Sequence, residues 1–221
     1  MPGMITSLVA QAKNKERVNV FLDGEFAFGL AMIEALKLRK GQRLSDQEID
    51  RLKTLDEIEV AHERALNFLS YRPRSVAEVQ RNLKDKGFSP ETIDTVVQHL
   101  QDAQLLNDQA FVQYWVENRE TFGPRSARAL RFELRKKGVA DPDIAPALET
   151  VDEEDAACRA ARPLAKRHTA LDWQAFRKKL GDFLLRRGFP YPVIRDAVKR
   201  LWAENASPER QDTDANFSDV D

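Results

Sequence analysis

The sequence has little of what most catalytic and metal-binding sites are made from. Its 221 residues include one cysteine, Cys158, and three histidines, His62, His99 and His168. A single cysteine excludes an internal disulfide and fits a reducing compartment. The alanine-rich stretch around Cys158 favours a small buried residue over a nucleophile. Because the histidines are far apart and lack the spacing of metal ligands, we expect no metal site.

Long apolar runs and glycine-rich loops are lacking as well. No apolar run approaches the roughly 18–20 residues that a membrane span requires. The opening MPGMITSLVA has no basic region before an apolar core, so we expect no secretory signal. We find no phosphate loop, no nucleophile elbow and no paired carboxylate motif for a metal. The sequence therefore indicates a cytoplasmic protein that is not an enzyme, has no catalytic residues and needs no cofactor.

The formal net charge of −1 averages two different regions of the chain. Residues 203–221 contain six acids and one arginine, so residues 1–202 carry +4 when the whole chain carries −1. This end has few large apolar side chains to bury, and we interpret it as a disordered acidic tail. The tail could screen a basic surface on the body. A solubilising role is the simpler reading, since an acidic end needs no partner to explain it.

The first thirty residues differ from the rest because they favour strands. Apolar, β-prone stretches occupy residues 5–11, 17–22 and 25–30. Asp23-Gly24 joins the last two stretches and is a strong hairpin signal, while Asn14 suits the earlier turn. We expect a three-strand meander and then a short helix that begins near Ser45, where Glu48 completes a capping box. Residues 1–53 are the predicted N-terminal extension.

From residue 54 onward one pattern occurs three times. Three glycines, Gly87, Gly138 and Gly188, are separated by 51 and 50 residues, and each directly follows a basic residue. Each is expected to end a helix. Apolar residues hold the same five positions around each glycine: Val79, Leu83, Ile93, Val97 and Leu100; Leu130, Leu134, Ile144, Leu148 and Val151; Leu180, Leu184, Ile194, Val198 and Leu201. A period of about fifty residues lies in the range of solenoids and arrays.

We interpret the pattern as three tandem three-helix repeats, similar to helix-turn-helix modules, in a mainly α protein. The predicted bounds are 54–106, 107–151 and 152–202, with the first helix over 56–70. Asn107 is expected to cap the first helix of the second repeat. Pro163 lies inside the first helix of the third repeat, where we expect a kink or a break.

Basic residues gather on the middle helices of these repeats. In the second repeat, Arg128, Arg131 and Arg135 share one helical face, next to the apolar one. Cations lie just before the glycines, as with Lys86, Lys137 and Arg187. Their position is explained equally well by the helix macrodipole, which favours cations at a helix C-terminus, and by binding to a partner. Arg125, Arg128 and Arg131 stand near a helix N-terminus, where cations are disfavoured, so an interaction is the better interpretation.

The aromatic and polar residues do not favour the reading of bases. Phe111, Trp115, Phe132 and Trp202 fit core positions better than stacking platforms. Helix starts that read DNA bases would offer Asn or Gln, but here they offer arginines and a serine, which suit phosphate or carboxylate.

Several motifs, taken in their order and spacing, resemble the RecX family, bacterial regulators of the RecA recombinase. They are YRPRS (71–75), LKDKGF (83–88), LLND followed by Phe111 (105–111), GPRS (123–126), LRKKGV (134–139) and LLRRGF (184–189). The match spans about residues 56–202. The segment NKERVNVFLDGEFAFGL (14–30) is similar to the β-hairpin extension of longer members.

The resemblance implies an elongated, curved array of three-helix repeats that lies in the groove of a RecA–DNA filament as a monomer. It implies inhibition of RecA ATP hydrolysis, recombination and co-protease activity, in DNA repair and the SOS response. The alternative is a module that binds single- or double-stranded DNA phosphates directly. The expected partner-binding residues are basic: Arg72, Arg74, Arg81, Lys84, Lys86, Arg125, Arg128, Arg131, Arg135, Lys136, Arg177, Lys178, Arg186 and Arg187.

Overall fold

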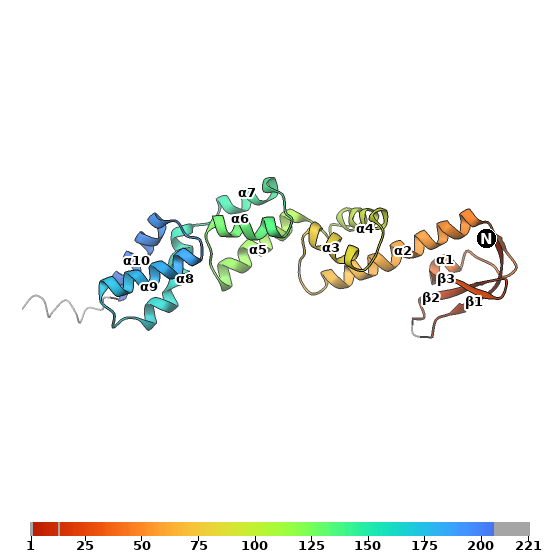
Figure 1. Ribbon diagram of the computed structural model, residues 1–221, viewed down its shortest axis with the longest axis horizontal. Coiled ribbons are helices and arrows are strands. Elements are labelled where there is room, and N and C mark those ends of the chain that lie inside the picture. The colour runs from red at the N-terminus through yellow and green to blue at the C-terminus, as the bar shows by residue number, and fades with distance from the viewer. Residues whose placement is uncertain (1, 13, 206–221) are drawn as a thin grey trace, which may run out of the picture. The chain divides into compact units, whose positions relative to one another are not determined.

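The computed structural model describes residues 2–12 and 14–205 (Figure 1). The chain divides into two compact units, Met1–Asn107 and Asp108–Asp221.

The first unit begins with a small antiparallel sheet. Its strands are β1 (Gly3–Ala10), β2 (Arg17–Leu22), β3 (Glu25–Ala31) and β4 (Arg43–Leu44), in the order β3-β2-β1-β4. Asp23 and Gly24 have φ values of 48° and 94°, which confirms the predicted hairpin turn. The prediction missed β4, a two-residue strand that pairs with the start of β1. The short helix α1 (Met32–Ala35) follows β3, and Ile5, Val20 and Leu30 are buried in this domain's own core.

A single helix, α2 (Asp46–Leu69), connects the sheet with the first repeat (Figure 1). Its capping box is the predicted one: the Ser45 hydroxyl accepts from the Glu48 backbone N–H, and the Glu48 carboxylate accepts from the Ser45 N–H. The expectation of a short helix near Ser45 and a second helix over 56–70 was wrong. No proline or glycine interrupts residues 46–69, so nothing in the backbone ends the helix.

Three groups of helices follow, as predicted. The first repeat consists of the C-terminal part of α2 with α3 (Val76–Asp85) and α4 (Pro90–Asp102). The second consists of α5 (Asp108–Phe122), α6 (Ala127–Lys136) and α7 (Asp141–Glu149), and the third of α8 (Glu153–Arg167), α9 (Trp173–Arg186) and α10 (Tyr191–Asn205). Each repeat has a separate hydrophobic core.

The repeated positions do what the sequence pattern predicts. Gly87, Gly138 and Gly188 end the middle helices with φ values of 87°, 83° and 87°, in the left-handed region that glycine enters without steric cost. The fifteen repeated apolar positions are buried, except that Val151 is only partly buried against its core. The three-helix repeat is therefore set mainly by a helix-ending glycine and an apolar stripe on each flanking helix.

The third repeat departs from the other two at its helix starts. Asp172 caps α9 by accepting from the Ala175 backbone N–H at 2.8 Å, where Ser75 and Ser126 cap the middle helices of the other repeats. The helix α8 runs through Pro163 without a break. The helix α10 continues to Asn205, past Ala203, where the acidic tail was predicted to begin. The rest of that tail lies outside the described residues.

Candidate functional site

The residues most suited to chemistry are dispersed in the described part of the chain. Cys158 is buried in the core of the third repeat, and burial raises the pKa of its thiol, so it is poorly suited to act as a nucleophile. His99 is exposed at the surface of α4. Within residues 2–12 and 14–205, no three His, Cys, Asp or Glu side chains are placed to hold a metal ion. None of the helices described there is long and apolar enough to cross a membrane.

Some of the predicted partner-binding cations have partners within their own repeat. Arg72 pairs with Glu78 at 2.9 Å and so supports the capping box of α3. The Arg74 guanidinium stacks over the Phe68 ring at 3.9 Å, and its pKa is lowered by desolvation and by the charge of Arg72. Arg135 pairs with Asp141 and lowers the pKa of that carboxyl through the hydrogen bond between them.

Arg125 belongs to a polar cluster around Glu133, which sequence reasoning missed. The Glu133 carboxylate accepts from the indole N–H of Trp115 and from Nε of Arg119, both at 2.9 Å, and pairs with Nε of Arg125 at 3.0 Å. Three donors thus converge on one partly buried carboxylate. Arg125 consequently helps to hold α5, α6 and the loop before α6 together, as well as presenting charge.

Arg187 takes part in the joint between the second and third repeats. Its guanidinium stacks over Phe183 at 4.6 Å and donates to the Pro124 carbonyl at 3.2 Å. Desolvation and the nearby charge of Arg125 lower its pKa. Glu153 completes the joint by accepting from the Ala127 backbone N–H at 2.8 Å, which satisfies a free donor at the start of α6. Arg187 is therefore a structural residue in large part.

The remaining predicted cations have no carboxylate within ion-pair distance in the described part of the chain. They lie on the middle helix of each repeat or at its end, and all are exposed: Arg81, Lys84, Lys86, Arg128, Arg131, Lys136, Arg177, Lys178 and Arg186. Arg131 is near enough to Asp141 to lower the pKa of that carboxyl. Arg128 on α6 and Lys178 on α9 stand at equivalent positions, ten residues before their glycines. These side chains keep their charge available to a partner.

The expectation that Phe132 is a core residue was wrong. It is 60% exposed, and the ammonium of Lys136 lies 4.8 Å from its ring centre. Leu130 and Leu134 form the buried stripe of α6, and a residue two positions from a buried one points to the opposite side of a helix. Helical spacing alone would have placed Phe132 outside. Phe111 is buried as expected, and Trp115 and Trp202 pack partly buried against their cores.

Family models match nearly the whole of the described chain. The model described as the RecX regulatory protein N-terminal domain matches residues 3–45. The models for the first, second and third RecX three-helix domains match residues 61–100, 107–148 and 152–198. Their order is that of the sheet and the three repeats described above.

Whole-chain relatives and solved structures agree with the family models. The chain is 35% identical to the regulatory protein RecX of Bacillus subtilis (strain 168), over 91% of this chain and 78% of that protein. It is 31% identical to RecX of Geobacillus sp. (strain WCH70), over 96% and 81%. A crystal structure of regulatory protein RecX matches with a TM-score of 0.67 and 26% identity, covering 91% of this chain and 99% of the other. RecX from Lactobacillus salivarius matches with a TM-score of 0.59 and 26% identity, covering 66% and 97%. The chain therefore belongs to the RecX family of regulatory proteins.

Proposed function

We propose that this protein is a monomeric cytoplasmic regulator that binds the RecA nucleoprotein filament in its groove. Bound there, it inhibits ATP hydrolysis, recombination and co-protease activity in DNA repair and the SOS response. The observation that carries the proposal is the repetition, on α3, α6 and α9, of exposed cations that have no carboxylate partner among the described residues, within a chain of the RecX family.

The proposed mode of action requires contacts with the filament and does not require catalytic residues. Inhibition by occupying a groove needs charge and shape at several points along a polymer, and a repeated module can meet a repeated partner. Arg128 and Lys178, at equivalent positions in two repeats, fit carboxylates or phosphates spaced along such a partner. The elongated, curved arrangement of the repeats remains a prediction of this proposal.

The test is the rate of ATP hydrolysis by RecA on single-stranded DNA as this protein is added. We expect the rate to fall. Replacing Arg128 and Arg131 together by alanine should weaken the inhibition several-fold while the helical circular dichroism signal stays unchanged, because both side chains are exposed and make no ion pair with any residue that the structure describes.

The matched control replaces Lys166 and Arg167 by alanine. These residues also lie exposed in the second unit, have no carboxylate within ion-pair distance in the described chain, and were not predicted to bind a partner. This variant should inhibit as the unaltered protein does. Equal weakening by both pairs would mean that only net charge matters, and unchanged ATP hydrolysis at excess protein would contradict the proposed function.

Direct binding to DNA phosphates is the second candidate, favoured by the same exposed cations. A protein that neutralises several phosphates loses affinity steeply as salt rises, because counterions are released on binding. Tight binding to bare DNA at low salt, lost between about 50 and 200 mM salt, would support this candidate. Weak binding in the absence of RecA would exclude it.

A further inference from the structure

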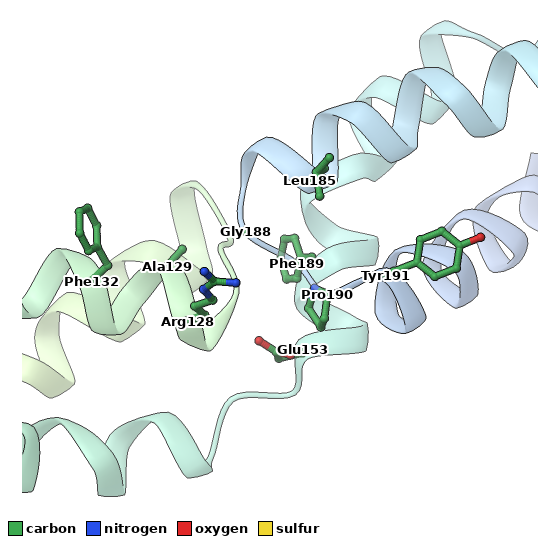
Figure 2. A pocket seen from close by; sticks show the side chains of 9 residues that line it. All are labelled: Arg128, Ala129, Phe132, Glu153, Leu185, Gly188, Phe189, Pro190 and Tyr191. Atoms are coloured by element: carbon green, nitrogen blue, oxygen red, sulfur yellow. The ribbon is translucent and has the colours of Figure 1, made fainter.

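The second unit contains a cleft whose apolar lining the proposed function does not use. Its volume is about 630 Å³, and it lies between α6 of the second repeat and the turn from α9 to α10 of the third (Figure 2). Arg128 and Phe132 line it from α6, and Leu185 and Tyr191 line it from the third repeat. The position of its two walls is fixed by the joint between the repeats, where Ser126 and Ala129 pack against Gly188.

Large apolar side chains are left uncovered at this cleft. Phe132 is 60% exposed, Leu185 64% and Tyr191 72%. Single exposed apolar residues are ordinary, but several gathered at one hollow mark a surface that binds something. Two cations stand beside them: Arg128 lines the cleft, and the ammonium of Lys136 lies over the ring of Phe132. Glu153 also lines the cleft, and its carboxylate accepts from the backbone N–H of Ala127 at 2.8 Å. An apolar side chain flanked by carboxylates has the chemistry to fill such a site.

The chain itself provides a segment of this chemistry. Residues 206–221 include five acidic residues and one arginine, and Phe217 is the only aromatic residue among them. Asp214, Asp219 and Asp221 stand within four residues of Phe217. This combination matches an apolar hollow with basic neighbours better than it matches the exposed polar surface of a helix.

The segment is long enough to reach the cleft. The helix α10 begins at Tyr191, which lines the cleft, and ends at Asn205, so its fifteen residues place the end about 22 Å away. Phe217 is twelve residues beyond Asn205, and twelve extended residues span up to about 40 Å. Lys199 of α10 is an exposed cation between the two ends of this path in the sequence, while Arg195 is paired with Asp196 at 2.8 Å. Reach and charge therefore both permit the return.

We propose that Phe217 and its flanking aspartates dock in the cleft between the second and third repeats, against Phe132, Leu185 and Tyr191. A tethered segment acts at an effective concentration on the order of 1 mM. An intrinsic dissociation constant of about 0.1 mM would then keep the cleft about nine-tenths occupied. Docking also covers Arg128, so it would compete with the filament; this consequence rests on the proposed function, whereas the docking does not.

Paramagnetic broadening in the full-length protein tests the docking. A nitroxide is attached to Ser218→Cys, and mass spectrometry confirms a single label, since Cys158 is buried and its thiol pKa is raised. We expect the backbone amide signals of Phe132, Gly188 and Tyr191 to broaden. Adding Phe217→Ser should remove this broadening, and so should Leu185→Ser. The matched control Leu105→Ser changes a leucine that is 54% exposed outside the cleft, and it should leave the broadening intact.

Two outcomes would overturn the docking. One is broadening at the cleft that is absent or unaffected by Phe217→Ser. The other comes from a mixture in which one set of molecules carries the nitroxide and a second set carries the isotope label without the nitroxide. If the cleft signals of the second set broaden as strongly as they do within one molecule, the occupant is the tail of a second copy.

The regulatory consequence has its own readout, in RecA ATP hydrolysis. If the tail covers the cleft nine-tenths of the time, Phe217→Ser should lower the concentration for half-inhibition about tenfold. An unchanged concentration would overturn the competition while leaving the docking in place. If neither the unaltered protein nor the Phe217→Ser variant inhibits RecA, the proposed function is contradicted. The nitroxide experiment would still decide whether the tail docks.

Discussion

Arginines that look alike in the sequence have different surroundings in the structure. Arg125 and Arg128 stand three residues apart at the start of α6, and both were predicted to bind a partner. Arg125 pairs with Glu133, whereas Arg128 lies exposed beside the cleft without a carboxylate partner in the described residues. The difference depends on where Glu133 points after folding, so residue spacing alone could not predict it. Charge reversal at Arg125 would place two carboxylates together and disturb the fold, which is why the binding test uses Arg128 and Arg131.

The helix-ending glycines differ in what surrounds them. A Cβ atom at Gly188 would lie 2.8 Å from Oγ of Ser126 and 3.0 Å from Cβ of Ala129, whereas a Cβ at Gly87 would meet nothing within 4 Å. Both glycines have a φ of 87°. An alanine at either position takes on left-handed strain, and only the alanine at position 188 also collides with the joint between the second and third repeats.

We therefore predict that Gly87→Ala lowers the free energy of unfolding by about 1–2 kcal/mol. Gly188→Ala should lower it by a further 1–3 kcal/mol or so, the range for overpacked sites. Urea unfolding followed by circular dichroism measures both values. Equal losses would mean that the joint yields to the added methyl group, and the packing of Gly188 against Ser126 would then contribute little to stability.

At the scale of elements, the sequence predicted best where a local rule decides the structure. Asp23-Gly24 made its turn, Ser45 made its capping box, and the three glycines ended their helices. It predicted worse where an element depends on distant pairing or on the absence of a signal. The two-residue strand β4 exists because β1 lies beside it, and α2 is continuous because nothing interrupts it.

The continuity of α2 leads to a prediction at Lys53, an exposed residue in its interior. If the helix runs unbroken through this position, Lys53→Gly should be less stable than Lys53→Ala by about 1 kcal/mol, because glycine loses more backbone entropy in a helix interior. Urea unfolding of the two variants gives the difference. Equal stability would instead support two helices separated near residue 54, as the sequence first indicated.

At the scale of the whole molecule, the chain has several cores instead of one. The sheet and each repeat bury separate sets of residues, and the division at residues 107 and 108 separates the first repeat from the second. In repeat proteins, stability is approximately the sum of the repeats and of the interfaces between neighbours. Damage to one core should therefore remain largely local.

Leu83→Ala tests this locality, because Leu83 is fully buried in the core of the first repeat. We expect a loss of about 2–5 kcal/mol in that repeat. Hydrogen exchange should accelerate over residues 61–100 and stay unchanged over residues 152–201. Leu184→Ala, at the equivalent position of the third repeat, should give the opposite pattern. Faster exchange in both regions for either variant would indicate one cooperative unit.

The proposed mode of action requires the array of repeats to be long, and neither the sequence pattern nor the separate units determine its length. To touch several protomers of a filament, the repeats must extend along it, since helices packed at about 8–10 Å build a long surface only when the repeats succeed one another. A compact globule of about 200 residues has a radius of gyration of about 16–17 Å. Small-angle scattering from a chain that ends at Asn205 should give a clearly larger value. A radius near that of the globule would leave the cations of α3, α6 and α9 unable to follow a polymer, and groove binding would then have to be abandoned even if RecA were inhibited.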